Sequence, residues 1–217
     1  MNEDKFVQEK SLDEDHLVSE EKNIKDHEMY TEKFGKIKSY RSIKRDGNCM
    51  YLSIGIQLIN YVRSHPEFRQ KWDSFLEKSI QYFNNMKIEE FTYSDYLETI
   101  KNLVDNDVGF EDLDKYSLYE IIYFLRLVIS AEMRNNSSKY EPFLVDMSVS
   151  DYCKHNVEPF FSEAGYIEIG ALVEILPLNI EVIDIQEQTE NCTRVYGIHD
   201  DAITIIHTPN HFEPGYY

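Results

Sequence analysis

The sequence is poor in cysteine and contains no long apolar run, and each scarcity excludes a class of protein. The three cysteines, Cys49, Cys153 and Cys192, do not suggest a disulfide scaffold. No apolar stretch approaches the roughly 18 residues of a membrane span. The charged first residues also lack the apolar centre of a secretion signal. We therefore expect reduced thiols, no membrane association and a location in the cytosol, with the nucleus as an alternative.

Basic residues are scarce as well. Lys and Arg number 22 against 40 Asp and Glu, so the formal net charge is −18. This balance argues against nucleic acid and anionic membranes as partners. The length fits one domain with an extension, and we expect a monomer. We interpret residues 1–33 as an acidic N-terminal arm, either mobile or a helix that a partner orders, and residues 34–217 as the globular domain.

Hydrophobic spacing predicts a helical first half. Residues 50–62 are apolar on nearly every face, which is typical of a buried helix. Further helices are predicted over 13–34 (polar), 66–83, 92–104, 117–133, 149–156 and 165–176. Two of them are predicted to begin at capping boxes, Thr92 with Asp95 and Ser117 with Glu120.

The pattern changes near the C-terminus. Residues 179–185, 194–198 and 202–206 are rich in β-branched side chains and predict three strands. The lead-in at 37–43 is predicted to be extended or irregular. Helices followed by a small, mainly antiparallel sheet indicate the α+β class.

A turn precedes the predicted central helix and ends in a cysteine. Asp46, Gly47 and Asn48 are turn formers, and Cys49 follows them at the start of the helix. The helix dipole and free N–H groups favour an anion there, so the thiol pKa should fall. The same N–H groups are suited to a developing oxyanion. The alternative is that Cys49 is a small buried hydrophobe.

A base for such a thiol is available at the far end of the chain. A thiolate nucleophile needs an imidazole to take and return a proton, and His211 follows the last predicted strand. The imidazole in turn needs an acceptor. Glu213 lies on the same side of an extended strand as His211, and Asn210 is a second candidate.

Together these motifs resemble the ovarian-tumour (OTU) class of cysteine deubiquitinases, and the middle of the chain resembles its otubain members (peptidase family C65). The segments that carry the resemblance are Asp46-Gly47-Asn48-Cys49, Phe124-Leu125-Arg126-Leu127, Tyr140-Glu141-Pro142-Phe143, Val149-Ser150-Asp151-Tyr152-Cys153, Ile167-Glu168-Ile169-Gly170-Ala171-Leu172 and Asn210-His211-Phe212. These segments follow one another along the chain in the same order as in otubains. Three positions depart from the family: Glu213 falls where otubains have an aspartate, Met50 where they usually carry an aromatic residue, and Leu52 where they usually carry an arginine.

The resemblance implies an OTU-like fold and a thiol hydrolase that needs no cofactor or metal. It implies that Cys49 is the nucleophile, that His211 is the general base with Glu213 as its acceptor, and that Asp46 shapes the oxyanion site. The implied reaction is cleavage of the isopeptide bond after the C-terminal Gly-Gly of ubiquitin in chains, through a thioester. The implied partners are ubiquitin, polyubiquitin chains and, through the N-terminal arm, ubiquitin-conjugating enzymes.

Other interpretations remain at this point. One is a module that binds ubiquitin and conjugating enzymes with weak or no hydrolysis, and another is a thiol protease for a different ubiquitin-like modifier. Asp46 has the alternative of a simple turn residue, and Glu213 that of a solvated strand-end glutamate. Cys153 and Cys192 are predicted to be inert. A zinc site at His207 and His211 is disfavoured because Pro209 prevents a shared helical face.

Overall fold

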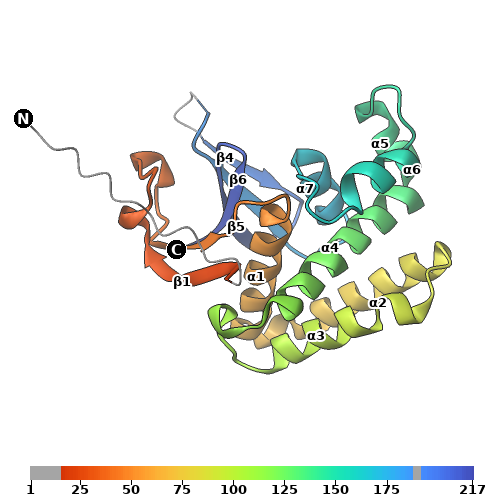
Figure 1. Cartoon of the computed structure of the whole chain (residues 1–217), viewed down its shortest axis with the longest axis horizontal. Coiled ribbons are helices and arrows are strands. Elements are labelled where there is room, and N and C mark those ends of the chain that lie inside the picture. Colours follow the sequence, from red (N-terminus) through yellow and green to blue (C-terminus); the bar gives the residue numbers. More distant parts are fainter. Residues whose placement is uncertain (1–15, 188–191) are drawn as a thin grey trace, which may run out of the picture.

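A six-stranded mixed sheet stands against a group of helices in the computed structural model, which describes residues 16–187 and 192–217. The strands are β1 (Val18–Asn23), β2 (Ser39–Ile43), β3 (Asn179–Asp184), β4 (Thr193–Tyr196), β5 (Ala202–Thr208) and β6 (His211–Tyr216). The helices are α1 (Cys49–Ser64), α2 (Arg69–Asn85), α3 (Ser94–Asp105), α4 (Lys115–Asn135), α5 (Ser137–Tyr140), α6 (Val149–Tyr152) and α7 (Tyr166–Val173). The predicted α+β class is confirmed (Figure 1).

The sheet has the strand order β1-β2-β6-β5-β3-β4. Only the β3–β5 pair is parallel among the described strands; the other pairs are antiparallel. The three predicted strands correspond to β3, β4 and β5, whereas β1, β2 and β6 complete the sheet beyond that prediction. β6 lies between β2 and β5, so its side chains are held in the middle of the sheet.

Helix α1 lies beside the strands and packs against both α3 and α4, and α4 packs in turn against α2 and α3 (Figure 1). Polar side chains of α1 fasten it to the sheet: the Gln57 amide donates to the carbonyls of Thr204 (2.7 Å) and Gly215 (2.6 Å). The α1–α4 contact is close because a Cβ on Gly55 would come within 2.2 Å of Ile121. These contacts hold the middle of α1 between the sheet and α4.

The predicted helix over 13–34 is wrong for residues 16–34. Residues 18–23 instead form β1, which pairs antiparallel with β2 from Val18 opposite Ile43 to Asn23 opposite Ser39. Ile24 and Phe34 are then buried in a small apolar cluster under this end of the sheet. The apolar residues here are too sparse for a helical stripe, and backbone pairing with β2 satisfies the segment instead. The rest of the predicted arm, residues 1–15, lies outside the described residues.

The helix starts also differ from the prediction. Helix α4 begins three residues earlier than its predicted capping box, because the Asp114 carboxylate accepts the backbone N–H groups of Tyr116 (2.8 Å) and Ser117 (3.2 Å). Helix α3 has no side-chain cap at Tyr93, so the Thr92–Asp95 box is not formed. In the described parts of the chain, no helix combines the length and the apolarity that crossing a bilayer requires.

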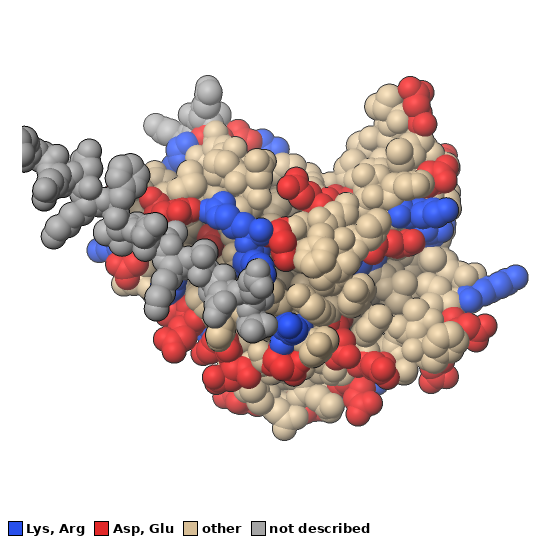
Figure 2. Space-filling model, viewed as in Figure 1, with Lys and Arg blue, Asp and Glu red and all other residues tan. Residues whose placement is uncertain are grey.

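Acidic side chains gather along the lower edge of the face shown in Figure 2, where α3 lies in Figure 1. On this face, acidic side chains are therefore concentrated on the helical side of the molecule. Such a surface favours basic partners over nucleic acid.

Candidate active site

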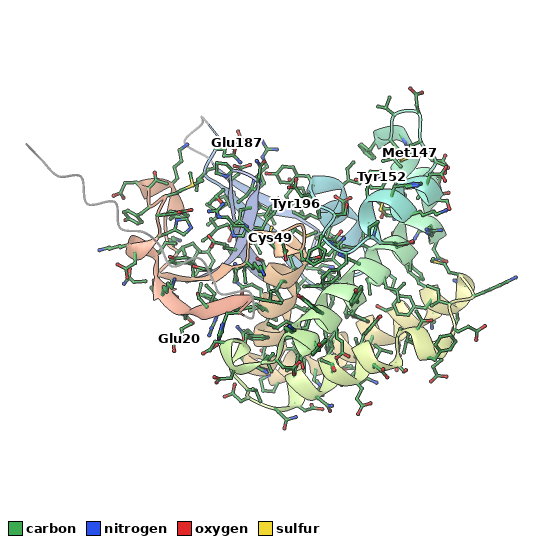
Figure 3. The ribbon with its side chains drawn as sticks, in the orientation of Figure 1. Glu20, Cys49, Met147, Tyr152, Glu187 and Tyr196 are labelled. Carbon is green, nitrogen blue, oxygen red and sulfur yellow. The ribbon has the colours of Figure 1, made fainter. Side chains whose placement is uncertain are left out.

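Cys49 is the first residue of α1 and is buried, with 7% of its surface exposed. Figure 3 shows it at the end of α1 that faces the strands. The preceding turn is closed by Asp46, whose carboxylate accepts the Asn48 backbone N–H at 2.8 Å. The Asp46 carbonyl accepts the Cys49 N–H at 3.3 Å. Asp46 thus shapes the turn, and the Cys49 N–H becomes free for an oxyanion only when it leaves that carbonyl.

Gly47 allows a second loop to lie directly against this turn. A Cβ at Gly47 would stand 1.9 Å from the carbonyl oxygen of Phe161, a distance that no side chain tolerates. The Phe161 N–H also donates to the Asn48 side-chain oxygen at 3.3 Å. Phe161 itself has a φ of 70°, in the left-handed region that non-glycine residues rarely adopt. The turn and this loop therefore form one packed unit beside the thiol.

Arg126 of α4 joins these two loops, a role that was not predicted from the sequence. Its Nη2 donates to the Gly47 carbonyl (3.0 Å), the Asn48 side-chain oxygen (2.8 Å) and the Ser162 carbonyl (2.8 Å), while Nη1 donates to the Val157 carbonyl (2.7 Å). The residue is 1% exposed. An arginine inside an otherwise apolar helix was the available signal, since a buried guanidinium requires several acceptors.

His211 is the first residue of β6 and is 1% exposed. A two-residue turn at Pro209 and Asn210 places it opposite Thr208 of β5, with Asn210 at a φ of 55°. Its Nε2 lies 3.5 Å from a Glu213 carboxylate oxygen. Its Nδ1 has no hydrogen-bond partner among the described residues. Nδ1 is therefore the nitrogen available to the Cys49 thiol.

The charge state of His211 follows from its neighbours. Burial lowers the pKa of this imidazole, but its interactions with the Cys49 thiol and the Glu213 carboxylate outweigh burial and raise the pKa to about 9. The imidazole is therefore held as an imidazolium at neutral pH.

Glu213 lies two residues along β6, on the same face as His211, and is 5% exposed. The alternative of a solvated strand-end glutamate is therefore wrong. Burial would raise the pKa of its carboxyl, but hydrogen bonds from His211 and His27, together with the positive charge of His211, lower it to about 2. Glu213 is thus ionised throughout the physiological pH range. Although glutamate is one methylene longer than aspartate, one carboxylate oxygen of Glu213 still lies 3.5 Å from His211 Nε2.

His27 is a second residue that the sequence analysis missed. Its Nε2 lies 2.7 Å from the other carboxylate oxygen of Glu213, and the pair is buried. His27 belongs to the segment after β1 that was assigned to the N-terminal arm. No sequence signal marked it, because a single histidine in an acidic segment carries no spacing information.

The thiols of the remaining cysteines bond to other residues: Cys153 to the Ser130 carbonyl and Cys192 to the Lys33 carbonyl. Cys153 is fully buried, and burial raises the pKa of its thiol, as expected for an inert residue. Cys192 is buried in the apolar cluster with Phe34. Met50 and Leu52, at the positions where the sequence departs from the otubain pattern, are both core residues. Asn210 lies in the turn before β6, and the carboxylate near His211 is that of Glu213.

A thiol, an imidazole and a carboxylate are therefore aligned across α1 and β6. In the ranges 16–187 and 192–217, no group of three or more His, Cys, Asp or Glu side chains is arranged to hold a metal ion. The arrangement suits nucleophilic attack by sulfur on an acyl carbon, with His211 moving the proton and Glu213 orienting His211.

Comparison with known proteins agrees with this geometry. The sequence profile of the family Peptidase C65 Otubain matches residues 2–213. The human ubiquitin thioesterase OTUB2 is 29% identical over 68% of this chain and 67% of its own, and the otubain-like ubiquitin thioesterase of Caenorhabditis elegans is 27% identical over 84% and 69%. A solved structure described as a ceOTUB1 ubiquitin aldehyde UBC13~Ub complex superimposes with a TM-score of 0.76 at 21% identity, over 93% of each chain. The chain belongs to the otubain family of cysteine peptidases, C65.

Proposed function

We propose that this chain is a deubiquitinating thiol hydrolase that cleaves the isopeptide bond after the C-terminal Gly-Gly of ubiquitin in polyubiquitin chains. The observation that carries the proposal is the alignment of Cys49 at the start of α1 with His211 and Glu213 on β6. The names of the curated relatives as ubiquitin thioesterases supply the substrate class.

In the first half of the reaction, the Cys49 thiolate attacks the carbonyl carbon of the last ubiquitin glycine. The carbonyl electron pair moves to oxygen, and the Cys49 N–H stabilises this oxyanion once it leaves the Asp46 carbonyl. When the oxyanion collapses, the C–N bond breaks and the His211 imidazolium gives its Nδ1 proton to the departing lysine amine. The products are a ubiquitin thioester on Cys49 and a free amine.

In the second half, His211 is neutral and takes a proton from water. The resulting hydroxide adds to the thioester carbon, and collapse breaks the C–S bond. The released ubiquitin carboxylic acid loses its proton to solvent and leaves as a carboxylate, and the thiolate–imidazolium pair is restored. Glu213 remains ionised throughout and holds the Nε2 side of the ring.

The proposed partners are two ubiquitin units of a chain and, in addition, a ubiquitin-conjugating enzyme. The fold neighbours include complexes whose printed descriptions name ubiquitin aldehyde with UBC13~Ub and with UBCH5B~Ub. We assign the second ubiquitin and the conjugating enzyme to the N-terminal residues 1–15, together with the adjoining edge strand β1. A binding module with little hydrolysis is disfavoured here, because Glu213 is buried and ionised beside His211.

The function is tested by incubating the protein with ubiquitin that carries a C-terminal thiol-reactive electrophile. We expect one covalent adduct by intact mass, and none with Cys49→Ala. The control is Cys153→Ala, which should form the adduct as the parent does because the Cys153 thiol is buried and bonds to the Ser130 carbonyl. Ubiquitin binding without an adduct would favour the binding module, and neither binding nor adduct would point to another ubiquitin-like modifier.

The role of the N-terminal residues is tested by a deletion that leaves β1 intact. Deleting residues 2–13 should reduce cleavage of diubiquitin several-fold, while the rate of the single-ubiquitin adduct stays within about twofold, because only the second unit loses contacts. The measurement is the rate of each reaction under identical conditions. Equal changes in both rates would contradict a role at the second ubiquitin. A deletion that extends to residue 28 would remove β1 and His27, and would disturb both reactions.

A further inference from the structure

We propose that His27 is a positioning residue of the active site, which holds the Glu213 carboxylate so that its other oxygen faces His211. The inference rests on the proposed thiol hydrolase function. It extends the aligned residues from three to four, in the order Cys49, His211, Glu213, His27. The fourth comes from a segment N-terminal to the nucleophile, on the opposite side of the Glu213 carboxylate from His211.

The direction of the hydrogen bond follows from both ring nitrogens of His27. Nδ1 accepts the backbone N–H of Met29 at 3.0 Å, so Nδ1 carries no proton. The ring proton is therefore on Nε2, which lies 2.7 Å from Glu213 Oε2. A neutral His27 thus donates to a buried carboxylate, which is the strong, charge-assisted type of hydrogen bond.

The ring of His27 is fixed by its surroundings as well. It meets the rings of Phe34 and Tyr40 edge-on, with centroid distances of 5.2 and 4.7 Å. Its backbone N–H donates to the Ile24 carbonyl and its carbonyl accepts the Tyr30 N–H. His27 is 5% exposed. The donor is therefore rigid, as a positioning group must be.

Glu213 needs such a donor because a glutamate has one more rotatable bond than an aspartate. The two carboxylate oxygens are divided between partners: Oε2 with His27 at 2.7 Å and Oε1 with His211 at 3.5 Å. The shorter contact, to His27, fixes the position of the carboxylate, and this position places the other oxygen beside His211. The titratable groups facing this carboxylate are His27 from the first segment and His211 from β6, with Cys49 of α1 beyond His211.

The test compares His27→Leu, which removes the donor, with His27→Gln, whose amide N–H reaches about as far as Nε2. With a ubiquitin substrate, we expect His27→Leu to lower kcat about tenfold, the size of one charge-assisted hydrogen bond, with KM within about twofold. His27→Gln should restore most of kcat. A higher KM with kcat unchanged in His27→Leu, or no recovery of kcat in His27→Gln, would overturn the proposal.

A second readout does not depend on ubiquitin. Iodoacetamide reacts with the thiolate. At pH 6 the rate of Cys49 alkylation therefore reports how much thiolate forms with the help of His211, whereas at pH 10 even an ordinary cysteine is mostly thiolate and the rate no longer depends on His211. We expect His27→Leu to slow the reaction at pH 6 about as much as it slows kcat, and to leave it unchanged at pH 10. If the parent protein did not react with ubiquitin but the alkylation rates changed as expected, the proposed function would be overturned and the role of His27 would stand.

The double variant and a matched control separate positioning from stability. In a Glu213→Ala background, His27→Leu should have no further effect on the pH 6 alkylation rate, because His27 acts only through Glu213. Tyr140→Phe removes a neutral donor from another buried carboxylate, that of Glu132 at 2.9 Å. It should lower Tm comparably and leave alkylation unchanged. Additive effects in the double variant, or slowed alkylation in Tyr140→Phe, would show that His27 is only structural.

Discussion

Replacing His211 by alanine should reduce kcat/KM by on the order of 10³-fold, while Glu213→Ala should reduce it by only about 10- to 100-fold. His211 gives and takes the reacting proton, so nothing in the site replaces it. Glu213 acts through His211, and a misoriented imidazole still transfers protons at a reduced rate. Steady-state kinetics with a fluorogenic ubiquitin substrate measure both effects. Equal activity of Glu213→Ala and the parent would remove Glu213 from the site.

The same pair of residues sets the pH profile. The His211 imidazolium is lost as pH rises through its pKa of about 9, so kcat/KM should fall on the alkaline side near that pH. The negative charge of Glu213 helps to raise this pKa, and Glu213→Gln removes the charge. The alkaline limb of Glu213→Gln should therefore move to lower pH. A limb that stays at the parental pH would show that Glu213 does not interact with the imidazolium.

Arg126→Met should lower the free energy of unfolding by about 3–5 kcal/mol, because four acceptors, three of them buried, lose their donor together. At roughly 2–4 °C per kcal/mol for a chain of this size, Tm should fall by about 10 °C. Activity should fall more than stability explains, because the released groups include Gly47 and Asn48 next to Cys49. Arg126→Lys should not rescue, since an ammonium lacks the planar fork that spans these acceptors.

Arg134→Met is the matched control on the same helix. Its guanidinium is partly exposed and pairs with Glu158, a type of surface contact worth about 1 kcal/mol or less. Thermal unfolding and the alkylation rate of Cys49 should therefore remain near the parental values. Similar losses in Arg126→Met and Arg134→Met would mean that helix α4, and not the Arg126 hydrogen bonds, supports the site.

The helices and the two residues Cys49 and His211 could be predicted from the sequence, each from a different signal. Helices α1 to α4 carry long apolar stripes, so hydrophobic spacing finds them. Cys49 and His211 are recognisable because turn residues and a strand end surround them. Asp114 was missed as a cap since a second capping pattern lay three residues later.

Strands β1 and β6 could not be found by the same means. β1 (VSEEKN) buries only its first two side chains and is held by backbone pairing, so its pattern resembles a polar helix or arm. β6 contains Pro214 and Gly215, which argue against a central strand. The proline is tolerated because the ladder with β2 comprises only the pairs at Gly215 and Tyr216. The partners of Arg126 and Glu213 likewise come from distant segments.

The four hydrogen bonds of Arg126 have a consequence for motion. One rigid guanidinium binds the Gly47–Asn48 turn and the Ser162 loop at once, so neither loop can swing open alone. Release of the Cys49 N–H from the Asp46 carbonyl therefore carries the Phe161 loop with it, as a single concerted displacement. We therefore expect the Cys49 N–H and the Phe161 loop to shift together when a substrate binds.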